Sequence, residues 1–171
     1  MPQKMPFPPV SWTNTGETNL RLALYQPDIP QNAGSLMRLC ACLGVAMDII
    51  EPCGFLLTDR NFRRAGMDYR DGVDLSRHEN WDAFRAKAPG RLLLLTTKSA
   101  RPFTGFAFAP SDTLILGRES VGVPETVHDT VDARLLIPMR PGMRSLNVAQ
   151  AAAMVLGEAL RQTGLFPGAS G

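Results

Sequence analysis

Hydrophobic positions along this 171-residue chain follow two periods in turn, one typical of buried strands and one typical of amphipathic helices. Short apolar runs bounded by proline, glycine or polar residues predict strands that are covered on both faces. These predicted strands are residues 20–25, 45–50, 73–75, 91–97, 113–116 and 134–137. Because helical patterns separate them, we expect an α/β fold, with a mostly parallel sheet and helices on both faces.

The helical patterns have recognisable starts and ends. A first helix is expected to begin at Asn32, a residue type that commonly caps helices, and to end at Gly44. Residues 81–87 predict a second helix, and residues 59–65 a short one with exposed arginines. The longest helix is expected from Asn147 to Gly164, whereas Pro27 and Pro30 predict an irregular segment before the first helix.

Composition is that of a globular protein, with 44% hydrophobic and 20% charged residues. We expect one domain over residues 20–164, a flexible extension at 1–19 and a tail at 165–171. No apolar run reaches the roughly 20 residues that span a bilayer, and residues 1–19 lack a secretory pattern, so no membrane partner is expected.

Charge and cysteine content bear on the binding partner and on the cellular compartment of the protein. The net charge of +2 does not by itself indicate a nucleic-acid partner, but 15 arginines against 3 lysines suit phosphate and base recognition. Cys40, Cys42 and Cys53 have no metal-binding spacing and are expected to be buried free thiols. An odd number of cysteines fits a reducing compartment, which predicts a cytoplasmic protein.

Candidate chemistry lies in three segments of small and polar residues that follow apolar runs: residues 30–38, 114–124, and 137–139 with 145–147. Open α/β sheets place ligand sites at such positions. The chain has no Rossmann G-x-G-x-x-G, P-loop or G-x-S-x-G pattern, which argues against dinucleotide, NTPase and serine-hydrolase sites. His78 and His128 lack metal-ligand neighbours and are expected on the surface or in loops, so no metal site is predicted. The pattern favours an unusual nucleotide-like ligand held by loops.

These segments resemble motifs 1, 2 and 3 of the SPOUT superfamily, the α/β-knot RNA methyltransferases. The matching patterns are Asn32-x-Gly34-x-x-x-Arg38, Gly117-x-Glu119-x-x-Gly122, and Ile137-Pro138-Met139 with Ser145-Leu146-Asn147. The resemblance covers residues 20–164, and residues 25–30 and 63–69 resemble the superfamily's minimal tRNA 2′-O-methyltransferases, which act on the wobble nucleotide. It implies a C-terminal trefoil knot, S-adenosyl-L-methionine as cofactor, tRNA (leucine isoacceptors) as substrate and a homodimer.

The resemblance also implies a catalytic set. Arg38 matches the family's catalytic arginine, either as a base for the ribose 2′-hydroxyl or, because arginine stays protonated, as an electrostatic stabiliser. Asn32 is expected to hold Arg38 or the substrate, or to cap its helix, and Glu119 to pair with Arg38 or Asn32. Ser145 and Asn147 complete the set near a helix N-terminus.

Binding residues are implied in the same way. The family's cofactor positions correspond to Leu95, Gly117, Ile137, Ser145 and Leu146. Sheet core is the alternative for Leu95 and Ile137, and Gly117 requires either a positive φ or a close backbone approach. RNA phosphates are expected at Arg63, Arg64, Arg118, Arg140 and Arg144, the alternative being a solvated charged face.

Two other functions stay open at this point. The same chemistry could serve another tRNA or ribosomal RNA position, or the chain could be a knotted RNA-binding module without catalysis. The presence of Arg38, Asn32, Glu119 and Asn147 together argues against the latter, since a degenerate copy would be expected to lose some of them.

Overall fold

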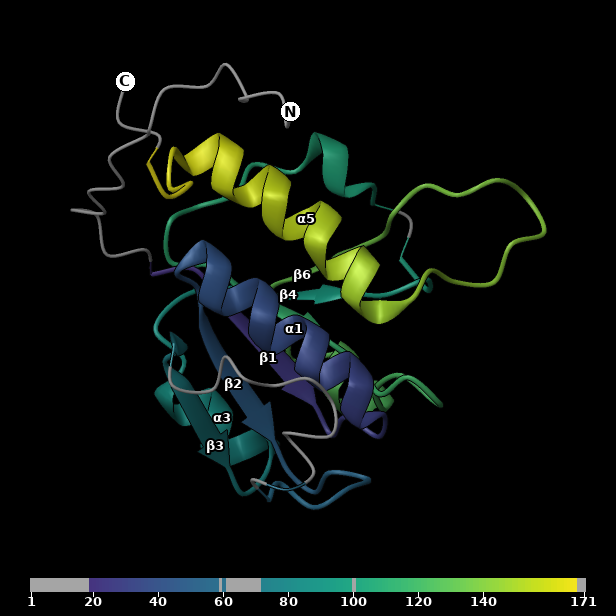
Figure 1. The fold of residues 1–171 in the computed structure, drawn as a ribbon. Coiled ribbons are helices and arrows are strands. Elements are labelled where there is room, and N and C mark those ends of the chain that lie inside the picture. Colours follow the sequence, from purple (N-terminus) through teal and green to yellow (C-terminus); the bar gives the residue numbers. More distant parts are fainter. Residues whose placement is uncertain (1–18, 59, 61–71, 100, 169–171) are drawn as a thin grey trace, which may run out of the picture.

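A computed structural model describes residues 19–58, 60, 72–99 and 101–168. Its centre is a six-stranded sheet in the order β3-β2-β1-β5-β4-β6 (Figure 1). The strands are β1 (Arg21–Tyr25), β2 (Ala46–Ile50), β3 (Leu75–His78), β4 (Leu92–Leu95), β5 (Thr113–Leu116) and β6 (Ala133–Leu135). Every neighbouring pair is parallel, so all six carboxyl ends lie along one edge of the sheet.

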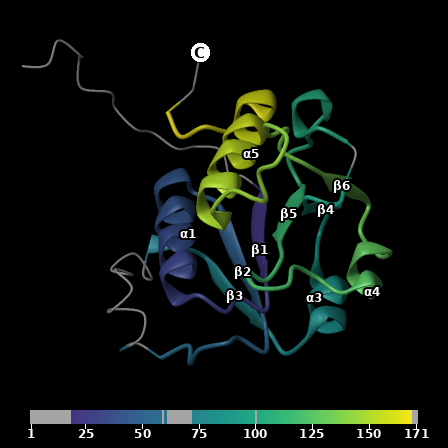
Figure 2. The same cartoon turned by 90° about the vertical axis from the view of Figure 1, so that its right-hand side faces the viewer.

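Helices cover both faces of this sheet, as the sequence predicts. They are α1 (Pro30–Leu43), α3 (Trp81–Lys87), α4 (Glu125–His128) and α5 (Val148–Thr163), with a short 3₁₀ turn η2 (Phe103–Gly105). In Figure 2, α1 and α5 lie on one side of the sheet and α3 and α4 on the other. Met37 and Leu156 belong to the buried cluster of the first face, and Phe84 and Val127 to that of the second.

Strand boundaries agree with the sequence prediction to within two residues, except at the edge strand β3. The strand predicted at 73–75 lies at Leu75–His78 instead. Because β3 is the outermost strand, its positions Ser76 and Arg77 are polar, and the apolar pattern does not mark them. Residue 60 apart, the short helix predicted at 59–65 lies outside the described residues.

The start of α1 corrects the predicted cap at Asn32. The helix begins two residues earlier, at Pro30, and its N-cap is Ile29, which makes no side-chain capping bond. Proline is tolerated in the first turn because its fixed φ suits the helix and the missing N–H has no intrahelical partner there. The side chain of Asn32 is therefore released from capping. The predicted end at Gly44 is confirmed, with φ of 65°.

A buried polar cluster on the α3 face corrects the expectation that the histidines are exposed. Asp48, 2% exposed, lies between Arg21 Nε at 2.7 Å and His78 Nε2 at 2.7 Å. The ring of His78 packs edge-on against Phe84. His128 on α4 is buried as well. A charged partner on the next strand explains why a polar side chain is stable at position 78.

The cysteines follow the predicted pattern only in part. Cys40 is buried, Cys53 is half-buried and Cys42 is exposed, so the expectation of a buried thiol was wrong for Cys42. Positions 40 and 42 lie two apart on α1 and point to different sides of the helix. Burial raises the pKa of Cys40 to about 12 and that of Cys53 to about 11, which keeps both as unreactive thiols.

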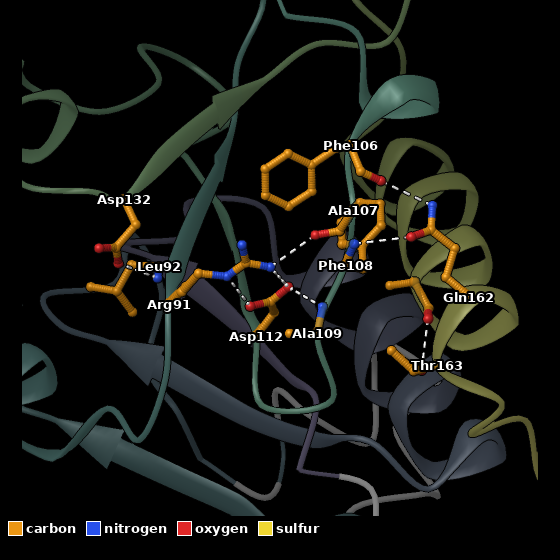
Figure 3. Close-up of polar contacts among 11 residues, drawn as sticks. Arg91, Leu92, Phe106, Ala107, Phe108, Ala109, Asp112, Asp132, Gln162 and Thr163 are labelled. Carbon is orange, nitrogen blue, oxygen red and sulfur yellow. Dashed lines mark hydrogen bonds and ion pairs between the residues drawn. The ribbon is translucent and has the colours of Figure 1, made fainter.

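Polar contacts at the amino edge of the sheet fix the C-terminal end of α5 (Figure 3). The side chain of Gln162 accepts a hydrogen bond from the N–H of Phe108 at 2.9 Å and donates to the carbonyl of Phe106 at 3.0 Å. Nearby, Arg91 donates twice to Asp112, at 2.8 Å each. With its C-terminal end held there, α5 points its N-terminal end towards the opposite edge, where the strands end.

The buried cluster predicts a large loss of stability on removing its carboxylate. Asp48→Ala leaves Arg21 and His78 without their shared partner, and we expect it to lower the free energy of unfolding by about 3–5 kcal/mol in urea denaturation. Arg77→Ala on the same strand as His78 removes an exposed ion pair with Glu51 and should cost less than about 1 kcal/mol. Equal losses in the two variants would contradict a buried charge network.

Candidate active site

A cleft of about 520 Å³ opens at the carboxyl ends of β4, β5 and β6. Its walls come from these strand ends, the loop after β5, the segment 137–147 and the facing turns of α1 and α5. The chain leaves the neighbouring strands β1 and β5 in opposite directions along the sheet, so the cleft lies at a topological switch point. Its volume is within the range of small-molecule sites.

Most of the residues singled out from the sequence line this cleft: Asn32, Leu95, Gly117, Arg118, Glu119, Ile137, Arg144, Ser145, Leu146 and Asn147. Leu95 and Ile137 also pack against the core of the α1–α5 face, so both readings of these two residues hold.

The remaining candidates lie elsewhere. Arg38 is on the exposed side of α1 and Arg140 is exposed, and neither lines the cleft. Arg140 belongs to the segment before α5, which extends away from the body in Figure 1. Arg63 and Arg64 lie outside the described residues.

A chain of side-chain hydrogen bonds joins three distant segments at the cleft. Asn147 Nδ2 donates to Asn32 Oδ1 at 3.0 Å, and Asn32 Nδ2 donates to Glu119 Oε1 at 3.4 Å. The second carboxylate oxygen of Glu119 accepts from the backbone N–H of Asp28 at 3.0 Å. The predicted pairing of Glu119 with Asn32 is therefore observed, and the amide of Asn32 is oriented by a partner on each side.

Asn147 has two tasks in this arrangement. Its Oδ1 caps α5 by accepting from the N–H groups of Ala149 at 2.9 Å and Gln150 at 3.3 Å. Its Nδ2 is left to donate into the cleft, so capping and a role in the site are compatible, as expected. Ser145 and Leu146 precede this cap on the cleft wall, close to the positive end of the helix.

Gly117 allows the loop after β5 to fold back on itself. Arg118 and Gly122 exchange two backbone hydrogen bonds, of 3.1 and 2.8 Å, and Gly122 has φ of 70°. A Cβ at position 117 would lie 2.9 Å from the carbonyl carbon of Gly122. Of the two explanations offered by the sequence, close backbone approach is the correct one. The hairpin of residues 117–122 carries Glu119 over the cleft.

Two carboxyl groups and one guanidinium set the electrostatics of this hairpin. Burial raises the pKa of Glu119, and the neighbouring Asp28 carboxyl adds to this effect. The pKa of Asp28 is lowered to about 2, first by a hydrogen bond with Glu119, then by Ser120 and by the charge of Arg118. Asp28 is therefore ionised at neutral pH, 3.7 Å from Arg118 Nε.

Sequence reasoning missed Asp28 and Ser120 as members of this network. Asp28 stands within residues 25–30, which already resemble the family, and Ser120 directly follows Glu119 in the second motif. Position in a motif was therefore an available signal, but their mutual contact depends on tertiary structure.

Within the described residues, no group of histidine, cysteine, aspartate and glutamate side chains could hold a metal ion. The same residues contain no helix that is long and apolar enough to cross a membrane.

The sequence model of the SpoU rRNA Methylase family matches residues 19–157. The chain belongs to this family. A relative from Beijerinckia indica subsp. indica, named tRNA (cytidine(34)-2′-O)-methyltransferase, is 66% identical over 146 residues, which are 84% of this chain and 91% of the relative. The resemblance drawn from the three motifs is thereby confirmed.

Two solved structures are similar to this chain in fold. One from work on the 2-OH methylation of C/U34 on tRNA is 41% identical, with a TM-score of 0.79, over 84% of this chain and 95% of that one. The SpoU methyltransferase AviRb from Streptomyces viridochromogenes, in complex with AdoMet, shares the fold with a TM-score of 0.73 at 24% identity. That match covers 86% of this chain and 62% of AviRb.

Close packing at Gly117 predicts that a single methyl group disturbs the hairpin of this SpoU protein. In Gly117→Ala the new Cβ meets the backbone of Gly122, so we expect faster hydrogen exchange of the Gly122 amide and a lower melting temperature. Gly157→Ala is the matched control, because a Cβ there meets nothing within 4 Å, and inside α5 it should stabilise by up to about 1 kcal/mol. Unchanged exchange in Gly117→Ala would refute the close-packing argument.

Proposed function

We propose that this SpoU-family protein transfers a methyl group from S-adenosyl-L-methionine to the ribose 2′-hydroxyl of the wobble nucleotide, C34 or U34, of tRNA, and that its substrates are leucine isoacceptors. The observation that carries the proposal is the intact Asn32–Glu119–Asn147 cluster at the cleft of a chain 66% identical to a tRNA (cytidine(34)-2′-O)-methyltransferase. The proposed location of the protein is the cytoplasm.

The cleft has features that fit the cofactor. Leu95, Ile137 and Leu146 give it an apolar wall suited to an adenine ring, and the missing side chain of Gly117, which also lines the cleft, lets the backbone of Gly122 close the hairpin. Ser145 lies near the N-terminal end of α5, whose partial positive charge suits a carboxylate. When bound, the cofactor supplies an electrophilic methyl group on a sulfonium sulfur.

The chain's own residues must then orient a ribose hydroxyl and favour loss of its proton. Asn32 is held between Asn147 and Glu119, so its amide has one orientation and can position a ribose with little reorganisation. Glu119 keeps that amide in place from the hairpin side. The cluster thus acts by preorganisation, and its geometry is set before substrate arrives.

Arg38 is assigned to the RNA side of this site, since it does not line the cleft. Arginine stays protonated in proteins, so we assign it the electrostatic role of stabilising the developing alkoxide rather than that of a base. Arg118 and Arg144 at the cleft, with the exposed Arg140, are assigned to phosphates of the RNA, together with Arg63 and Arg64.

The proposed assembly is a homodimer with a C-terminal trefoil knot. Support for the dimer comes from α5, where Met154 is 48% exposed beside the exposed Ala153 on the outer side of the helix. The knot is supported by the position of α5, which begins at the cleft where the segments after β5 and β6 meet. A two-fold interface would use the same surface on both copies.

Methyl transfer from labelled S-adenosyl-L-methionine to total tRNA of a strain lacking this gene, followed by nucleoside mapping, tests the function. We expect 2′-O-methylcytidine or 2′-O-methyluridine at the wobble position of leucine isoacceptors. Label at another position would retain the chemistry and reject the substrate. Cofactor binding without transfer to tRNA or ribosomal RNA would favour a non-catalytic RNA-binding module.

The assignment of Arg38 predicts a selective loss of turnover. We expect Arg38→Ala to lower kcat about 100-fold or more, while the Kd for S-adenosyl-L-methionine changes less than about twofold, because the lost charge acts on the transition state. Arg85→Ala, an exposed arginine on α3 at the opposite face, is the matched control and should keep wild-type kcat. An Arg38→Ala variant with wild-type kcat would show that Arg38 is not part of the catalytic site.

The dimer proposal is tested by mass in solution. A charge at the centre of an apolar interface is costly, so we expect Met154→Arg to reduce the mass measured by light scattering from twice that of the chain to that of one chain. Leu56→Arg, at an exposed leucine away from α5, should leave the mass unchanged. A wild-type protein that is monomeric at micromolar concentration would reject the dimer.

A further inference from the structure

Three consecutive residues of the hairpin contact one aspartate of the β1–α1 loop. Arg118 Nε lies 3.7 Å from Asp28 Oδ2, and Ser120 Oγ donates to the same oxygen. Between them, the side chain of Glu119 accepts from the Asp28 backbone N–H at 3.0 Å. Asp28 is thus the common partner of the hairpin, although 91 residues separate it from Glu119.

Asp28 is itself held from behind. The N–H of Gly54 donates to the carbonyl of Pro27 at 2.9 Å, and a Cβ at position 54 would lie 2.8 Å from the Cβ of Asp28. One residue earlier in the loop, Gln26 donates from its backbone to Ile50 at the end of β2. The aspartate therefore projects from a loop whose preceding residues are bound to the end of β2 and to the segment that follows it.

Arg118 meets Asp28 in a particular orientation. The atom nearest to the carboxylate is Nε, which is buried and makes no hydrogen bond, so the 3.7 Å contact with Asp28 is an ion pair. None of the hydrogen bonds among the described residues uses the two terminal nitrogens of Arg118, and the residue lines the cleft. A guanidinium whose Nε side faces a carboxylate keeps its outer edge for a second, anionic partner, which suits the bidentate geometry of a phosphate.

We propose that Asp28 is a positioning residue: it anchors the hairpin of residues 117–122 and turns the terminal nitrogens of Arg118 towards a phosphate of the RNA substrate. The inference rests on the proposed function, because it takes the anion to be an RNA phosphate. Asp28 does not contact substrate; it acts through Arg118.

The negative charge of Asp28 has to be offset if a polyanion is to bind beside it. An ionised carboxylate next to a site for a polyanion would repel it, and Arg118 offsets that charge while keeping its own outer edge exposed. The Asp28 and Arg118 side chains are 16% and 32% exposed, so the pair is only partly screened by water. Its main effect is on orientation and substrate affinity rather than on stability.

Asp28→Asn removes the charge that faces Arg118 but keeps the backbone N–H that binds Glu119 and an oxygen that can accept from Ser120. We expect the KM for tRNA to rise about fivefold, with kcat and the Kd for S-adenosyl-L-methionine changed less than about twofold. If Asp28 acts through Arg118, the Asp28→Asn/Arg118→Gln double variant should have the KM of Arg118→Gln alone.

Asp112→Asn is the matched control for a merely structural effect. It weakens a comparable aspartate–arginine pair, with Arg91, at the opposite edge of the sheet (Figure 3). We expect it to lower the melting temperature at least as much as Asp28→Asn and to leave the KM for tRNA unchanged. A rise in KM in both variants would show that loss of stability, not positioning, is the cause.

Two results would overturn the proposal: an unchanged KM for tRNA in Asp28→Asn, or additive effects in the double variant. A wild-type protein that methylates no RNA would instead reject the proposed function. In that case hydrogen exchange tests the anchoring role without any need for methyl transfer. If Asp28 anchors the hairpin, Asp28→Ala should speed exchange of the Gly122 amide about tenfold. Unchanged exchange would reject the anchoring role as well.

Discussion

The site depends on one continuous chain of hydrogen bonds, from Asn147 through Asn32 to Glu119 and the backbone of Asp28. The first link joins residues 115 apart and the second joins residues 87 apart, so no local segment could form it alone. Each of these three side chains makes hydrogen bonds through both of its polar atoms, which leaves one orientation for the amide of Asn32. The same asparagine that starts α5 also closes this network, so the end of the helix and the site form together.

The two edges of the sheet have different roles because all of its strands are parallel. At the amino edge, the Arg91–Asp112 pair and the contacts of Gln162 hold the fold together and fix one end of α5. At the carboxyl edge, loops of small and polar residues leave a cleft, and their hydrogen bonds serve orientation more than stability. The helix α5 spans both edges, so packing at one end determines where its N-terminus lies at the other.

Much of this arrangement could be predicted from the sequence, because strands buried on both faces give unmistakable apolar runs and Gly44, Gly117 and Asn147 mark chain reversals or caps. Several of the failures share one cause, which is that a contact with a residue distant in sequence decided the outcome. His78 is buried because Asp48 lies on the next strand.

Asn32 shows the same limit within the candidate site. Asn32 does not cap α1, because Pro30 starts the helix earlier and Glu119 and Asn147 bind its side chain. Arg38 lies on the exposed side of α1 and does not line the cleft, so its role in the site stays a prediction.

The order of the strands has a further consequence during synthesis. β5 lies between β1 and β4 but is made after both, so a nascent chain that ends before residue 113 presents an open apolar edge on β1. A chain with this strand order cannot be divided into two independently folding halves, because the sheet stays open at its centre until β5 is inserted.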